Sequence, residues 1–210
     1  FMERLPNTLL LGGAAVLIAV VVSLPLGIYT AIHQNTWKDT AGMIFALFGT
    51  SMPNFWLGLM LIIIFSLKLG LFPTGGKGGL DSLVLPAVTV GFGLAALITR
   101  TTRSSMLDVL RQDYMTTARA KGCSEKQVIT VHGLKNALIP IITYLGTHMA
   151  GIIGGASIVE TIFAIPGIGS YAIAGVQSKD YYVVQAYVLF SGCIYVLTNI
   201  LIDLIYIALD

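Results

Sequence analysis

The segment Asp113–Pro140, DYMTTARAKGCSEKQVITVHGLKNALIP, is basic and rich in helix-forming residues, although it lies between long apolar segments. The residues before Gly122 favour a helix, and Gly122 is a good helix stop because glycine adopts the left-handed conformation without steric cost. Ser124 and Gln127 have the spacing of a capping box, in which each side chain satisfies a free backbone N–H of the other residue. The pattern predicts a helix, a glycine turn and a second helix over residues 125–136.

The surrounding chain has the composition of a membrane protein. Of its 210 residues, 56% are hydrophobic and 10% are charged, a balance that does not suit a soluble surface. The net charge of +2 gives no overall field that would favour nucleic acid. Cys123 lies in a polar segment and Cys193 in an apolar one, so no disulfide is expected. Most of the chain is therefore predicted to face lipid.

Five segments are long and apolar enough to cross a bilayer, because a hydrocarbon core about 30 Å thick needs roughly 20 helical residues. Helices are expected because lipid cannot satisfy free backbone polar groups. The predicted fold class is an all-α polytopic membrane protein, with a single transmembrane domain over residues 1–210. The predicted spans are Leu9–Ile32, Ile44–Leu67, Leu80–Ile98, Leu138–Val159 and Val183–Leu209.

The basic residues predict the direction of these spans. Lys and Arg are enriched in cytoplasmic loops, and seven of the twelve lie in the loop over residues 99–137. This loop is therefore predicted to be cytoplasmic. Alternation puts residues 33–39 and the C-terminus on the same side, and the N-terminus, residues 72–82 and residues 160–182 outside. Five spans with an external N-terminus and no signal peptide form an unusual arrangement, so we expect at least one helix upstream of Phe1.

The loop over residues 99–137 has two interpretations. A solvated basic loop would serve only to set membrane orientation. Ordered helices joined by a tight turn favour a docking surface instead, because a simple tether does not need them. The chain also lacks a nucleotide-binding motif, so it is not expected to bind ATP, and its energy is expected to come from a partner. GGKGG (residues 75–79) does not match a phosphate-binding loop. That motif would need glycine at position 71 and serine or threonine at position 78, and the chain has Leu71 and Gly78 there.

The same residues carry a resemblance to a known family. The pattern TTARAKGCSEKQVITVHGLKNALIP resembles the cytoplasmic loop of binding-protein-dependent ABC importer permeases, in the branch that takes up dipeptides, oligopeptides or nickel. Other stretches, in order along the chain, are similar to the same branch. They are ERLPNTLLL (residues 3–11), SMPNFWLG (51–58), LFPTGG (71–76), LPAVTVG (85–91) and VETIFAIPGIG (159–169).

The resemblance implies a type-1 ABC importer transmembrane domain, with six spans in the full-length protein and a loop that docks on a cytoplasmic ATPase. The wider superfamily has Glu-Ala-Ala before the loop glycine, and only Ala118 matches that pattern here. The later Leu-Pro falls on Leu134 and Lys135, and the peptide and nickel branch departs in the same way. The residues that the resemblance assigns to ATPase coupling are Asp113, Thr116, Thr117, Ala118, Arg119, Lys121, Gly122, Cys123 and Ser124.

The resemblance also implies partners and a location. The partners are a second, homologous permease chain, two cytoplasmic ATPases that bind ATP and Mg²⁺, and an extracytoplasmic substrate-binding protein. The location is the bacterial inner membrane. The chain itself is expected to catalyse no reaction and to bind no metal or other cofactor, and its histidines form no H-E-x-x-H pair.

The substrate remains open at this point. Di- or oligopeptides are favoured because the branch mostly carries them. Nickel is the alternative, with Met52, His148 and Met149 as soft ligands, although such residues usually pack in protein cores. The candidate residues for the pathway or outer mouth are Ser51, Asn54, His148 and Glu160. For Glu160, a structural role that holds the following IPGIG turn is favoured over contact with the substrate.

Two rival functions remain. A channel or carrier driven by an ion gradient should place charged residues near the bilayer midplane, and the predicted spans offer almost none. A purely structural membrane subunit would show no substrate-dependent change in ATPase rate with its partners.

Overall fold

The computed structural model describes residues 2–76 and 78–209, except for the side chains of residues 148–155, 202–203 and 205–209. The described residues form helices, turns and loops without a strand, which confirms the predicted all-α class. The elements are α1 (Leu5–Ile32), α2 (Trp37–Ser51), α3 (Asn54–Leu61), the π-helix η1 (Ile62–Lys68), α4 (Leu80–Leu110), α5 (Asp113–Ala120), α6 (Glu125–Gln127), the π-helix η2 (Val128–Gly133), α7 (Leu134–Gly155), α8 (Ser157–Ile162), α9 (Ile168–Gln177) and α10 (Tyr181–Leu209).

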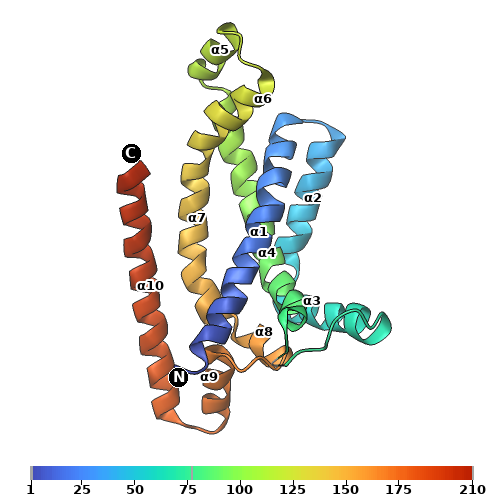
Figure 1. The fold of residues 1–210 in the computed structure, drawn as a ribbon, viewed down its shortest axis with the longest axis vertical. Coiled ribbons are helices and arrows are strands. Elements are labelled where there is room, and N and C mark those ends of the chain that lie inside the picture. The colour runs from blue at the N-terminus through green and yellow to red at the C-terminus, as the bar shows by residue number, and fades with distance from the viewer. Residues whose placement is uncertain (1, 77, 210) are drawn as a thin grey trace.

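The connections between helices gather at the two ends of the molecule (Figure 1). α5, α6, the turn between α1 and α2 and the C-terminal end of α10 lie toward one end, and the N-terminus, α8 and α9 lie toward the other. The predicted alternation of the loops is confirmed for these segments. We refer to the end that carries α5 as the cytoplasmic end, because its basic residues mark that side.

The centre of the fold is the packing of α1 against α4. A Cβ at Gly91 would lie 2.8 Å from the carbonyl oxygen of Ala15, and a Cβ at Gly27 would lie 2.5 Å from the Cβ of Thr102. Glycine at these two positions therefore lets the helices approach more closely than side chains would allow. Apolar residues of both helices, such as Leu11 on α1, fill the remaining space.

The second predicted span, Ile44–Leu67, is not one straight helix. α2 ends at Ser51 and the pair formed by α3 and η1 leaves it at an angle of 101°. The break falls at Met52–Pro53, where Met52 has an extended ψ of 124°. Proline disfavours a helical conformation in the residue before it, which explains the break. The described residues contain four single helices suited to a span, and a fifth span if the bent pair counts as one.

The boundaries of the third and fourth predicted spans also differ from the structure. α4 continues past Ile98 to Leu110, so the third span extends directly into the cytoplasmic end. The second loop helix and the fourth span form one helical run from Glu125 through η2 into α7. The helix then breaks at Ala156, before the predicted end at Val159. The cytoplasmic loop is therefore built on continuations of two spans.

Candidate functional site

The turn at Gly122 has the geometry of a Schellman motif. Gly122 has a φ of +80°, in the left-handed region. Its N–H donates to the carbonyl oxygen of Arg119 at 3.0 Å, and the Cys123 N–H donates to the carbonyl oxygen of Ala118 at 3.3 Å. These two hydrogen bonds satisfy carbonyl groups at the end of α5 that have no partner within the helix. The predicted glycine stop is confirmed.

The capping box after this turn is also present. The backbone N–H of Gln127 donates to Ser124 Oγ at 3.4 Å, and the Ser124 N–H donates to Gln127 Oε1 at 3.1 Å. The next helical run therefore begins at Glu125, with its first free N–H groups satisfied. Together, α5, the turn and α6 form a compact helical unit at the cytoplasmic end (residues 113–127; Figure 1). We call it the coupling loop, after the role that the resemblance predicts for it.

The coupling loop has its own small hydrophobic base. Met115, Ala118 and Val128 are buried and pack together. Met115 also approaches Gly133, where an added Cβ would lie 3.2 Å from the methionine Cε. Ala118 is the residue that matches the second alanine of the superfamily pattern, and at 6% exposure it packs inward. Ala118 therefore contributes to the packing of α5 on the helix after it.

The outer face of the coupling loop is polar and exposed. Asp113, Thr116, Thr117, Arg119, Lys121, Gly122 and Ser124 are exposed, and Cys123 is half-buried. Arg119 forms a bidentate pair with Glu125, with Nη2 at 2.9 Å from Oε1 and Nε at 3.1 Å from Oε2. The hydrogen bond to Glu125 raises the pKa of Arg119 above its ordinary value, and arginine is already charged at physiological pH without this shift. Such an exposed pair adds little to the free energy of unfolding, but it fixes the orientation of the Arg119 side chain.

The coupling loop is tied to two membrane helices. α5 comes after α4, separated from it by the two residues Arg111 and Gln112, and Tyr114 on α5 accepts a hydrogen bond from Asn136 Nδ2 on α7 at 2.8 Å. Met106, which is fully buried on α4, lies in the same region as the base of the loop, close to Gly133. A displacement of α5 would therefore act on both α4 and α7.

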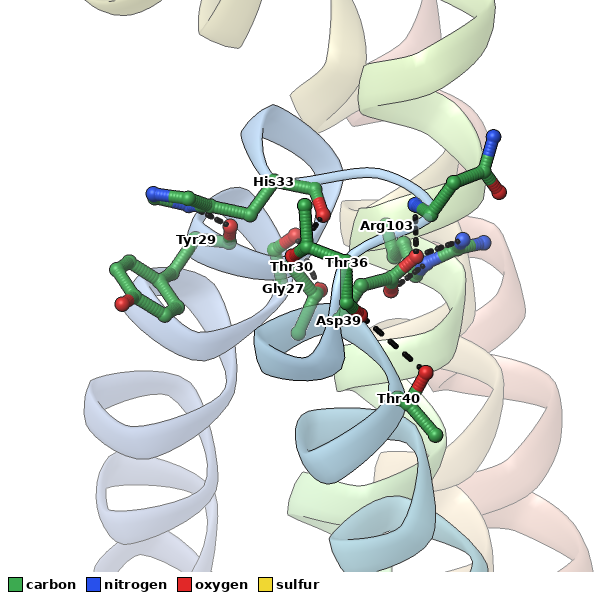
Figure 2. A network of polar contacts seen from close by, with 9 residues as sticks. Gly27, Tyr29, Thr30, His33, Thr36, Asp39, Thr40 and Arg103 are labelled. Carbon is green, nitrogen blue, oxygen red and sulfur yellow. Dashed lines mark hydrogen bonds and ion pairs between the residues drawn. The ribbon is translucent and has the colours of Figure 1, made fainter.

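An ion pair links α4, and with it the coupling loop, to α2 (Figure 2). It was not anticipated from the sequence. Arg103 on α4 contacts Asp39 in the first turn of α2 through two hydrogen bonds, Nε to Oδ1 at 2.6 Å and Nη2 to Oδ2 at 2.7 Å. The Asn35 N–H also donates to Asp39 Oδ2 at 3.0 Å. The Asp39 side chain is only 6% exposed and that of Arg103 is 22% exposed. In the sequence, Arg103 contributed only to the count of basic residues.

At the opposite end, Glu160 is fully buried and both its carboxylate oxygens accept hydrogen bonds. Thr8 Oγ1 donates to Oε1 at 2.6 Å, and the Ser170 N–H in the first turn of α9 donates to Oε2 at 2.8 Å. The Ile168 N–H donates in turn to Thr8 Oγ1 at 2.9 Å. A carboxylate suits this place because a helix N-terminus carries a partial positive charge. The network fastens α8 and α9 to the start of α1.

The start of α1, α8 and α9 together form what we call the outer assembly, and two other contacts strengthen it. Asn7 Nδ2 donates to the carbonyl oxygen of Pro166 at 2.9 Å, and the Gly76 N–H donates to the carbonyl oxygen of Phe163 at 2.8 Å. Phe163 is fully buried in a cluster with residues of α1 and α4. The stretches ERLPNTLLL, LFPTGG and VETIFAIPGIG, which lie far apart in the sequence, therefore meet at one end of the fold.

The four candidate pathway residues lie in different surroundings. Ser51 and Asn54 are exposed on either side of the bend between α2 and α3. Glu160 is enclosed in the outer network, so contact with a substrate would require that network to open. His148 belongs to α7, but its side chain lies outside the described residues, as does that of Met149. Sequence inspection missed Thr8 and Ser170 because hydroxyl residues near helix ends are common and carry no distinctive spacing.

The fold agrees with the comparison to known proteins. The profile of the family described as "Binding-protein-dependent transport system inner membrane component" matches residues 23–210. The chain belongs to this family of multi-pass membrane proteins.

Individual relatives support the same assignment, and a solved structure matches the fold. The glutathione transport system permease protein GsiC of Pectobacterium atrosepticum is 43% identical over 91% of this chain and 63% of its own length. That of Escherichia coli K12 is 40% identical over 99% of this chain and 68% of its own length. The chain thus spans about two thirds of the length of these relatives. An inward-facing MetNI methionine ABC transporter structure matches in fold, with a TM-score of 0.85 and 18% identity over 100% of this chain and 95% of that one.

Proposed function

We propose that this chain is the permease subunit of an ATP-driven importer and that it moves short peptides of the glutathione type across the inner membrane. The family match and the named function of the relatives support this proposal. Within it, an extracytoplasmic binding protein delivers the substrate to the end that carries α8 and α9. A second permease chain completes the pathway, and two cytoplasmic ATPases bind ATP and Mg²⁺. This chain binds no cofactor and catalyses no reaction.

The observation that carries the proposal is the coupling loop, with an exposed polar face on a buried apolar base. The base of Met115, Ala118 and Val128 makes the loop an ordered body that an ATPase could push or pull. Its links to α4 and α7 carry such a displacement into the membrane, and the pair of Asp39 and Arg103 carries it to α2. The loop shifts the conformation of the spans only if the ATPase holds it differently in its two states.

The direct test uses the full-length protein reconstituted with its partner subunits. We expect the binding protein loaded with glutathione to stimulate ATP hydrolysis and to support uptake into vesicles, and vanadate to abolish both. Nickel in place of the peptide should stimulate neither. Uptake that persists without ATP but depends on an ion gradient would contradict the proposal and support a carrier. An ATPase rate that no ligand changes would support a structural subunit.

The charge on α5 gives a sharper test of coupling. Arg119→Glu is expected to lower ATP-driven uptake at least tenfold while the ATPase subunits remain active, because it reverses the charge of the exposed face. The double variant Arg119→Glu with Glu125→Arg restores the local pair but not the charge on α5, so it should remain defective. Lys135→Glu makes the same charge change at an exposed site of α7 and should transport normally. Full rescue by the double variant would show that Arg119 acts only through Glu125.

A further inference from the structure

A groove lies between α1 and α2 near the cytoplasmic end. It is an open surface groove of about 700 Å³, and it is lined on α1 by Pro25 and Tyr29 and on α2 by Trp37, Lys38 and Phe45, among others. These residues come from the last part of α1 and the first part of α2, next to the connecting turn (Figure 1). The lining is almost entirely apolar, so the groove offers an acyl chain an apolar surface between the two helices.

The mouth of the groove carries one positive charge. The Lys38 ammonium lies 5.8 Å from the centroid of the Tyr29 ring, within range of a cation–π contact. The neighbouring carboxylate of Asp39 is held by Arg103 and by the Asn35 N–H, so it is engaged elsewhere (Figure 2). An anionic group is therefore the complementary ligand for Lys38 at this position.

The depth of the groove in the membrane agrees with a lipid ligand. Trp37 is 76% exposed and Tyr29 is 42% exposed, and both flank the turn between α1 and α2. Tryptophan and tyrosine are enriched at the level of lipid headgroups. An acyl chain that lies between α1 and α2 would then have its phosphate at the height of Lys38.

We propose that this groove binds one anionic phospholipid of the cytoplasmic leaflet. Its acyl chain lies along Pro25 and Phe45, and its headgroup phosphate pairs with Lys38 beside Trp37 and Tyr29. Because the lipid contacts both helices, it fastens α2 to α1 on the face away from the pair of Asp39 and Arg103. The proposal depends on the membrane orientation of α1 and α2 and not on the substrate that is transported.

Trp37 provides the reporter for a test. The full-length protein, with Trp37 as its only tryptophan, is reconstituted in mixtures that contain brominated phosphatidylglycerol or brominated phosphatidylcholine, and fluorescence quenching gives the relative affinity for each lipid. We expect a preference of about fivefold for phosphatidylglycerol, which corresponds to about 1 kcal/mol for one lysine at an anionic surface. Lys38→Gln should reduce the ratio to about one. Lys68→Gln, which removes an exposed lysine at the end of η1, should leave it unchanged.

A second variant tests the acyl-chain part of the site. Ala41 lines the groove and is exposed, so Ala41→Phe fills the groove without disturbing the core. It should weaken quenching by phosphatidylglycerol while expression and fold are retained. Equal quenching by both lipids in the parent protein would overturn the proposal, and so would a preference that survives Lys38→Gln. Quenching by neither lipid would show that protein covers the groove, from an upstream segment or the second permease chain, and would also overturn it.

Discussion

Replacing Gly122 with valine is expected to reduce ATP-driven uptake at least tenfold while membrane insertion and protein abundance stay near normal. An added Cβ would meet nothing within 4 Å, so the effect comes from the backbone and not from a clash. A residue with a Cβ pays about 1–2 kcal/mol in the left-handed conformation, and a β-branched one is a particularly poor fit there. Escape from that conformation breaks the two hydrogen bonds that end α5. Because about 1.4 kcal/mol corresponds to a factor of ten in an equilibrium constant, a penalty of this size lowers the population of the intact turn about tenfold.

The matched control for Gly122→Val is Gly122→Asn. Asparagine tolerates the left-handed conformation much better than valine does, so this variant should retain most of the uptake. The measurement compares uptake with the stimulation of ATPase activity by the loaded binding protein, in the reconstituted complex. Normal uptake by the valine variant at full expression would exclude the coupling loop as the element that transmits ATPase closure.

Replacing Asp39 with alanine is expected to destabilise the cytoplasmic end and to impair transport. The substitution removes both hydrogen bonds from Arg103 and the one from Asn35, and it leaves a largely buried guanidinium without its partner. Breaking a buried ion pair costs about 3–5 kcal/mol, and the lower value applies here because Arg103 keeps 22% exposure. For a domain of this size, about 3 kcal/mol corresponds to a decrease in Tm of roughly 6–12 °C.

The control for Asp39→Ala is Asp81→Ala, which removes an exposed acidic residue from the first turn of α4. Both variants lose a charge near a helix N-terminus, so the difference between their Tm values in detergent reports the contacts of Asp39 with Arg103 and with the Asn35 N–H. The exchange Asp39→Arg with Arg103→Asp should recover part of the lost Tm, because the opposite charges again face each other. Equal Tm values for the two alanine variants would show that the ion pair contributes nothing.

Local signals in the sequence predicted the coupling loop well. Gly122, Ser124 and Gln127 act on backbone groups within a few residues of themselves, so their hydrogen bonds could be inferred from spacing alone. The continuous helical run from Glu125 into α7 was not predicted, because apolar content marks where a span enters lipid and not where its helix begins. The role of the loop residues in coupling remains a prediction.

The sharp bend in the second span could not be predicted from the sequence for a different reason. The sequence contained the cause, since Pro53 restricts Met52, but proline also occurs inside α1, α4 and α7 without ending them. The packing of the helix after Pro53 decides the outcome. This helix, α3, lies against the outer assembly, where a Cβ at Gly58 would lie 3.1 Å from Phe163 Cε2. A contact between residues so far apart in the sequence leaves no local sequence pattern.

By itself, the sequence determined that this protein is helical, that it spans a membrane, which end carries the basic loop and where that loop turns. These properties depend on composition and on interactions between near neighbours, which a single chain displays directly. Only the tertiary structure decided that Asp39 pairs with Arg103, that Glu160 joins Thr8 to the start of α9 and that a groove beside Lys38 lies between α1 and α2. Each of these contacts depends on how distant helices pack, and that packing is determined by the whole chain.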